Sequence, residues 1–233
     1  MRKYNHLFFD LDHTLWDFDT NAKIALSDVF YEFDLNTIVT EDFNSFYEKY
    51  SHHNKILWDR YQNGFISSDE LKWKRMWRTL LEYKIGDEAM SKKMGYRFLE
   101  VLPTKTAMFD YSVEILNYLT QKNYTLHLIT NGFEKTQWSK LRNSKIEHFF
   151  THVITSEASN NMKPEKEIFE YALQKANALL TESIMIGDNL EADIKGAKNA
   201  GMDAIFVNHI NATTDIEPTY TITHLNELEN IFK

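Results

Sequence analysis

The chain has 233 residues, of which 43% are hydrophobic and 26% are charged, as is typical of one large globular domain or of a domain with an insert. Its formal net charge of -8 argues against a nucleic acid polymer as the main partner. An anionic substrate is compatible with this charge, because a bound divalent cation reverses the local field. The sequence contains no cysteine, which excludes disulfides, thiolate metal sites and a cysteine nucleophile.

The N-terminal residues and the hydropathy predict a cytoplasmic protein. The start, MRKYNHLFFDLDHTL, reaches an acid within ten residues and has no signal-peptide core. No apolar run approaches the roughly 20 residues that span a bilayer. We therefore expect no membrane association, and the sequence carries no signal for a particular oligomeric state.

The first predicted element is a strand, HLFFDL at 6–11, in which an apolar run ends in acidic residues. Residues two apart in a strand point the same way, so Asp10 and Asp12 are expected to face one site. Two carboxylates this close repel each other, and one tends to hold a proton unless a cation lies between them. The pair, followed by Thr14, indicates metal-assisted chemistry with a carboxylate nucleophile and a second acid that exchanges a proton. A strand running into an Asp-rich turn is the alternative.

The segment 16–105 is rich in aromatic and charged residues and contains no convincing strand run. Apolar residues recur at helical spacing in the stretches 43–50 and 71–81, and Asn63-Gly64 interrupts the pattern between them, as a helix–helix turn would. We therefore predict a small helical bundle inserted after the first strand. The expected domains are a core of residues 1–15 and 106–233 and an insert of residues 16–105.

The rest of the chain alternates helices with strands. The expected helices lie near 110–122, 133–143, 164–177 and 190–200, and the expected strands at 125–130, 152–156, 183–188 and 204–208. Such alternation is typical of right-handed βαβ units that form a parallel sheet covered by helices on both faces. The predicted fold class is therefore α/β, with the N-terminal strand in the same sheet.

Polar residues follow several predicted strands, at the edge where parallel sheets bind ligands. Thr130 and Asn131 end one strand, Asp188 ends another, and Lys163 precedes a helix. With the N-terminal acids, this set suits Mg²⁺ and phosphate, because Mg²⁺ prefers few carboxylates, water and phosphate oxygens. Thr130, the backbone N–H groups around Asn131 and the charge of Lys163 are expected to hold the phosphoryl oxygens. Taken singly, each residue has an alternative as a helix cap, a turn residue or a solvated charge.

These residues carry a resemblance to a known family. DLDHT at 10–14, Thr130, Lys163-Pro164 and GDNLEAD at 187–193 resemble, in order, the four motifs of the haloacid dehalogenase-like hydrolase superfamily. The long helical insert resembles its helical-cap (C1) type. The resemblance implies a Rossmann-like core with an α-helical cap, an aspartyl-phosphate intermediate and Mg²⁺ as cofactor.

The resemblance also implies a role for each motif residue. Asp10 would be the nucleophile at phosphorus, and Asp12 would protonate the leaving alcohol and later activate the hydrolytic water. The remaining implied roles are metal binding by Asp10, Asp12 (through its carbonyl) and Asp188, phosphoryl binding by Thr130 and Lys163, and support of Lys163 or of metal-bound water by Asp193.

A finer resemblance concerns the substrate. HNKILWDRYQNGFISSDEL at 53–71, LITNGF at 128–133 and THLNELENIF at 223–232 look like the bacterial pyrimidine and nucleoside 5'-monophosphatase branch, so the expected partner is a small phosphorylated metabolite. A sugar-phosphate phosphatase and a phosphomutase are the enzymatic alternatives. A haloacid dehalogenase is disfavoured, because Asp12 would have no task with a halide leaving group. A non-catalytic binding module is disfavoured because no required residue is missing.

Overall fold

The computed structural model describes residues 3–213 and 215–233. The chain divides into two compact units, which we call the sheet unit (Met1–Phe18 with Thr106–Lys233) and the helical unit (Asp19–Lys105). From the sequence we placed the first boundary after residue 15. Trp16 instead forms bridges with Asp12 and with Met108, which ties residues 16–18 to the sheet unit.

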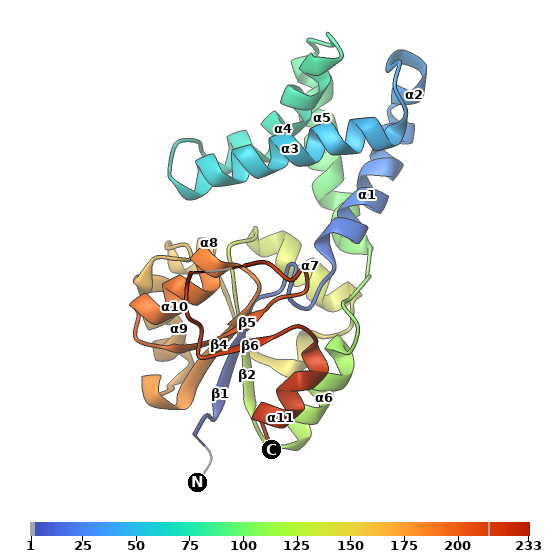
Figure 1. Cartoon of the computed structure of the whole chain (residues 1–233). Coiled ribbons are helices and arrows are strands. Elements are labelled where there is room, and N and C mark those ends of the chain that lie inside the picture. Colours follow the sequence, from blue (N-terminus) through green and yellow to red (C-terminus); the bar gives the residue numbers. More distant parts are fainter. Residues whose placement is uncertain (1–2, 214) are drawn as a thin grey trace. The chain divides into compact units, whose positions relative to one another are not determined.

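The described part of the sheet unit contains a six-stranded, all-parallel sheet with the order β3-β2-β1-β4-β5-β6 (Figure 1). This topology confirms the predicted α/β class with a Rossmann-like parallel sheet. The strands are β1 (His6–Phe9), β2 (Thr125–Thr130), β3 (Phe150–Thr155), β4 (Ser183–Gly187), β5 (Asp203–Val207) and β6 (Tyr220–Ile222).

The central strands are continuous apolar runs because both faces of the sheet are covered. Leu7, Phe8 and Phe9 of β1 are fully buried, and every residue of β4 is buried. Strand β1 is shorter than predicted. The N–H of Asp10 still donates to the carbonyl of Ile186, but the chain then turns, and the N–H groups of residues 14–16 donate to the carbonyl of Leu11. The edge strand β6 was not predicted, since it is short and mostly exposed.

Helices cover the sheet in the order expected from the sequence. The helices of the sheet unit are α6 (Ser112–Gln121), α7 (Glu134–Asn143), α8 (Ser156–Ser159), α9 (Lys166–Ala176), a π-helical segment (Leu190–Lys195) that continues into α10 (Gly196–Asn199), and α11 (Leu228–Ile231). Short 3₁₀ turns span Leu102–Thr104, Glu147–Phe149, Leu180–Glu182 and Leu225–Glu227.

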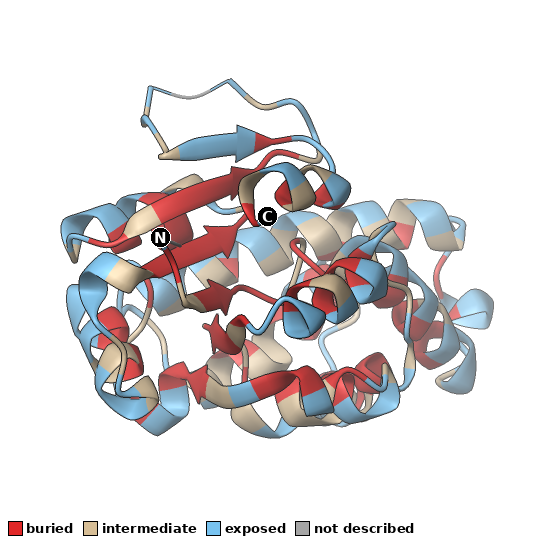
Figure 2. Cartoon of the chain, turned by 90° about the horizontal axis from the view of Figure 1, so that it is seen from below, coloured by how far each residue is buried: buried red, intermediate tan, exposed pale blue. Residues whose placement is uncertain are grey.

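A core of buried apolar side chains joins one face of the sheet to α9 and α10. Phe8, Ile129 and Met185 from three adjacent strands pack in this cluster with Phe169 of α9 and Ala197 of α10. In Figure 2 the strands are largely buried, whereas the helices around them present exposed outer surfaces. The carboxyl ends of the strands are thus held on a rigid, closely packed frame.

The helical unit, viewed by itself, contains the inserted bundle that the sequence predicts. Its helices are α1 (Phe18–Glu32), α2 (Leu35–Ile38), α3 (Phe43–Gln62), α4 (Ser68–Glu82) and α5 (Glu88–Val101). The Asp42 side chain caps α3, and a capping box between Ser67 and Glu70 begins α4. The predicted turn at Asn63-Gly64 joins these two helices. Across the described residues, no helix combines the length and the apolar character that crossing a membrane requires.

Candidate active site

The candidate site lies where the strand order reverses. Strands β2 and β3 follow on one side of β1, and β4, β5 and β6 on the other, so the carboxyl ends of β1 and β4 flank the switch point at which parallel sheets bind ligands. Asp10 directly follows β1 and Asp188 directly follows β4. The topology therefore brings together two acids that are 178 residues apart in the sequence.

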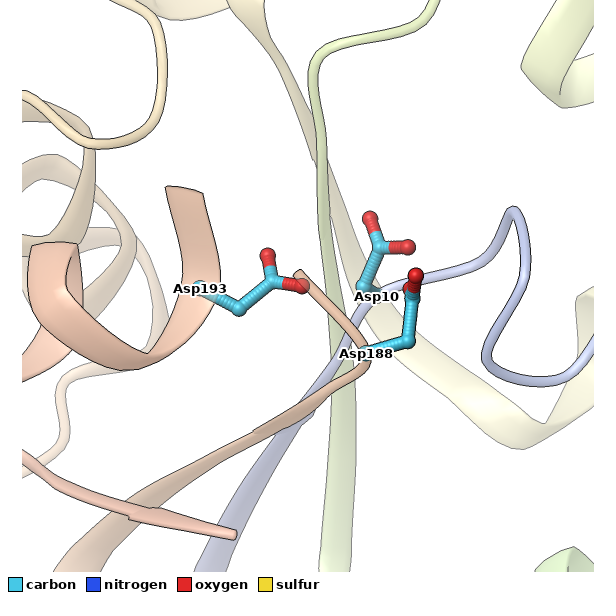
Figure 3. A group of neighbouring side chains, drawn as sticks. All are labelled: Asp10, Asp188 and Asp193. Carbon is cyan, nitrogen blue, oxygen red and sulfur yellow. The ribbon is translucent and has the colours of Figure 1, made fainter. Parts of the chain in front are cut away.

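Three carboxylates meet at this point. Oxygen atoms of Asp10, Asp188 and Asp193 all lie within 4.8 Å of one another, and Figure 3 shows the three side chains directed toward a common space. Asp193 comes from the π-helical segment, and its Oδ2 accepts a hydrogen bond from the backbone N–H of Asn189 at 3.0 Å. Thr14 donates to Oδ1 of Asp188 at 2.9 Å. Each acid is thus fixed by a different part of the sheet edge.

One lysine lies among these acids. Lys163 is 2% exposed, and its Nζ lies 2.6 Å from Oδ1 of Asp10, 2.6 Å from Oδ1 of Asp193 and 2.8 Å from the carbonyl of Ile129. Burial works to lower the pKa of this ammonium, but the charges of Asp10 and Asp193 outweigh it and raise the pKa. Lys163 is therefore a permanent positive charge within the site.

Asn131 holds the backbone of Lys163 in place. Its side-chain Oδ1 accepts from the N–H of Lys163 at 2.8 Å, and its Nδ2 donates to the Lys163 carbonyl at 2.8 Å. The side chain of Asn131 thus links the end of β2 to the Lys163 segment. That the backbone N–H groups around Asn131 bind a phosphate, as expected from the sequence, stays a prediction.

The acids outnumber the lysine, which makes the site suited to a cation. Burial and the nearby Asp193 and Asp188 raise the pKa of Asp10 well above its usual value, despite the opposing charge of Lys163. Burial and Asp193 raise the pKa of Asp188 to about 7. A divalent ion would relieve this repulsion, and clustered carboxylate oxygens are donors that Mg²⁺ accepts. The donor set therefore fits the magnesium ion implied by the motifs.

Thr130 ends β2 beside these groups. Its Oγ1 accepts hydrogen bonds from the N–H of Gly132 at 3.1 Å and from Nε2 of Gln137 at 2.6 Å. Because these two donors occupy the lone pairs, the hydroxyl hydrogen is left to be donated to another group. Gly132 leaves room for this amide, because a Cβ at this position would force the side chain of Gln137 to move.

Asp12 lies outside the cluster of three acids. Its carboxylate is bound by Lys140, with Nζ 2.6 Å from Oδ1 and 2.8 Å from Oδ2, and by Nε2 of Gln137 at 3.0 Å from Oδ2. We expected it to face the same site as Asp10 by strand alternation. That argument fails because β1 ends at Phe9, so the alternation does not extend to Asp12.

Comparisons with known proteins bear on this arrangement. Residues 7–207 match the family model described as haloacid dehalogenase-like hydrolase. The chain belongs to this family. It is 33% identical, over 98% of each chain, to the pyrimidine 5'-nucleotidase YjjG of Escherichia coli (strain K12). The glyceraldehyde 3-phosphate phosphatase of Methanothermobacter thermautotrophicus is 32% identical over 87% of this chain and 84% of that protein.

A solved structure from the same family is similar over the whole chain. The crystal structure of YfnB from Bacillus subtilis bound to magnesium superposes with a TM-score of 0.89 at 30% sequence identity, covering 99% of each chain. Together with the family match, it confirms the resemblance that the four motifs indicated.

Two residues of the site were missed by the sequence interpretation. Gln137 and Lys140 lie three apart on α7, so they point from the same face of this helix, and both are buried. The available signal was a pair of polar residues at helical spacing in the helix that directly follows the Thr130-Asn131-Gly132 turn. That signal is weak, because most such pairs lie on solvated helix faces.

Proposed function

We propose that this protein is a phosphatase that hydrolyses a small phosphate monoester through an aspartyl-phosphate on Asp10, with Mg²⁺ as cofactor. The observation that carries the proposal is the position of Asp10. It is buried at the switch point of the sheet, in contact with the ammonium of Lys163 and within reach of Asp188 and Asp193. A carboxylate nucleophile beside one ammonium and a cation site suits attack on an anionic phosphoryl group.

The residues of the chain account for both halves of the reaction. Oδ1 of Asp10 is bonded to Lys163, and an Asp10 oxygen attacks phosphorus while the ester P–O bond breaks and the ester oxygen takes a proton from Asp12. Water then attacks phosphorus, gives a proton to Asp12, and releases Asp10. Thr130 donates its hydroxyl hydrogen to a phosphoryl oxygen, and Lys163 offsets the negative charge. Asp10, the carbonyl of Asp12 and Asp188 would hold Mg²⁺, which would neutralise charge on the transferring group.

We infer that the substrate is a pyrimidine nucleoside 5'-monophosphate. The inference is supported by the similarity to YjjG, which extends over 98% of both chains. A three-carbon sugar phosphate is the second candidate, since a glyceraldehyde 3-phosphate phosphatase is nearly as similar, at 32% identity.

A phosphate-release screen in the presence of Mg²⁺ tests both statements. UMP, dUMP, glyceraldehyde 3-phosphate and hexose phosphates are compared, with the variant Asp10→Asn as control. We expect the nucleotides to be turned over best and Asp10→Asn to lose at least about 10³-fold in kcat, since the nucleophile is removed. Unchanged turnover by this variant would contradict the mechanism. Better turnover of sugar phosphates than of nucleotides would contradict the proposed substrate and favour the second candidate.

The phosphomutase alternative is separated by product analysis in ¹⁸O-labelled water. Hydrolysis incorporates the label into the released phosphate, because water attacks phosphorus. Transfer to a second alcohol leaves the product unlabelled and yields a new ester, which would contradict a phosphatase.

A further inference from the structure

We propose that Lys140 and Gln137 are positioning residues that orient the carboxyl group of Asp12 for proton transfer to the leaving oxygen of the ester. The proposal rests on the phosphatase function proposed above. It concerns two residues that the motifs do not include, both on α7 (Glu134–Asn143).

Lys140 and Gln137 together fix both oxygens of Asp12. The ammonium of Lys140 contacts Oδ1 at 2.6 Å and Oδ2 at 2.8 Å, and the amide of Gln137 contacts Oδ2 at 3.0 Å. The terminal torsion of an aspartate is broad and poorly determined by the backbone alone. Three hydrogen bonds from one face of a helix therefore select a single orientation of a group that would otherwise rotate.

The position of Lys140 is itself restricted. The residue is 2% exposed, and its Nζ lies 4.3 Å from the ring centroid of Trp16 and 5.4 Å from that of Phe18. A cation over aromatic faces is stabilised by the ring quadrupoles, and burial removes the rotamer freedom of the long side chain. The ammonium is thus held at a fixed place relative to Asp12.

Gln137 links the proton donor to the phosphate-binding residue. Its Nε2, which donates to Asp12, also donates to Oγ1 of Thr130 at 2.6 Å, and the residue is fully buried. Gly132 leaves the space that this amide occupies. Gln137 therefore fixes the distance between the carboxyl group of Asp12 and the hydroxyl of Thr130. Small displacements of groups that must align with the substrate reduce the reaction rate strongly.

The proton balance explains why these two donors suit Asp12. When the ester bond breaks, Asp12 gives its proton to the ester oxygen and becomes a carboxylate. The ammonium of Lys140 and the N–H of Gln137 bind that carboxylate in the structure. They hold it in place until it takes a proton from the attacking water, which restores the acid.

The test compares two esters with the variant Lys140→Met. Met is unbranched, only one atom shorter than Lys, and suits the aromatic neighbours, so the fold should survive. In UMP the leaving group is the 5'-oxygen of uridine, which needs a proton to leave. In nitrophenyl phosphate the leaving group is nitrophenolate, which leaves without one. We expect kcat/KM, which reports the steps up to departure of the alcohol, to fall about 10²-fold for UMP and less than about threefold for nitrophenyl phosphate.

Two further variants complete the experiment. Lys135→Met changes an exposed lysine on the same helix and should leave both esters unaffected. Lys140→Arg keeps the charge but changes its geometry, so kcat/KM should fall about tenfold for UMP and less for nitrophenyl phosphate. This variant also tests the proposal if Lys140→Met does not fold.

Equal losses for the two esters would mean that Lys140 acts only on the general structure of the site, and the proposal would be overturned. Unchanged kcat/KM for UMP would overturn it as well. Failure of the underlying function has a different signature, because the unmodified protein with Mg²⁺ would then release phosphate from neither ester.

Discussion

At the scale of single residues, the cluster of Asp10, Asp188 and Asp193 carries more negative charge than the ammonium of Lys163 neutralises. Lys163 pairs with Asp10 and with Asp193, whereas Asp188 accepts a hydrogen bond from the neutral hydroxyl of Thr14. Burial and the charge of Asp193 raise the pKa of Asp188 from 3.8 to about 7. Above that pH the ion-free protein holds a half-buried, poorly compensated carboxylate, which destabilises the fold.

We therefore expect Asp188→Asn to stabilise the ion-free protein at pH 8, and to stabilise it less at pH 5. A group with a raised pKa in the folded state adds stability that is complete below its unfolded pKa and is lost as the pH rises through its folded pKa. The stability that the protonated acid supplies is thus lost progressively between the unfolded pKa of 3.8 and the folded pKa of about 7. At pH 8 the Asn variant should be more stable by about 1 to 3 kcal/mol. Urea unfolding in the presence of a chelator measures the difference.

Addition of Mg²⁺ provides the control for this prediction. Ions that bind the folded state stabilise it by mass action, so MgCl₂ should raise the unfolding midpoint of the natural protein at pH 8 and raise that of Asp188→Asn much less. A variant that is less stable than the natural protein at pH 8 without ions would show that the charge of Asp188 is well compensated.

At the scale of elements, the helical unit depends on one close approach between helices. A Cβ at Gly95 of α5 would lie 2.6 Å from the carbonyl oxygen of Lys72 and 2.7 Å from Cα of Trp73, both in the backbone of α4. Backbone atoms cannot rotate away as a flexible side chain can. The two helices must therefore separate to admit even a methyl group.

Gly95→Ala should destabilise the protein by about 1 to 2 kcal/mol, although alanine is the better helix former by about 1 kcal/mol. The matched control is Gly86→Ala, because a Cβ at Gly86 meets nothing within 4 Å, and it should be neutral or slightly stabilising. Thermal unfolding followed by circular dichroism separates the two. If both variants melt at the temperature of the natural protein, the helices are not packed as closely as described.

The sequence predicted most of these elements but not how they end or what their polar residues touch. Strand β2 was predicted at its observed bounds, because apolar runs between turn residues are a local signal. The end of β1 at Phe9 and the edge strand β6 were missed, since both depend on neighbours distant in sequence. Gln137 and Lys140 were missed for the same reason, because their partner Asp12 lies 125 residues or more away.

At the scale of the whole molecule, the chain forms two compact units, and the cluster of three acids lies in one of them. The acids, Lys163 and Thr130 all belong to the sheet unit, which is built from two segments of the chain. The helical unit is one continuous segment with its own capped helices and its own aromatic contacts, among them Phe30 with Phe46 and Tyr50 with Phe98. Its folding should therefore require neither the sheet nor the cation.

This separation predicts that a fragment of residues 19–105 folds alone. It is large enough to bury a core, and we expect a helical circular dichroism spectrum, a cooperative thermal transition and a midpoint that MgCl₂ does not change. The intact chain should instead show a transition that MgCl₂ raises, because the three acids lie in the other unit. A fragment with the spectrum of an unfolded chain would show that the helices depend on the sheet unit. A fragment stabilised by MgCl₂ would place a cation site outside the sheet edge.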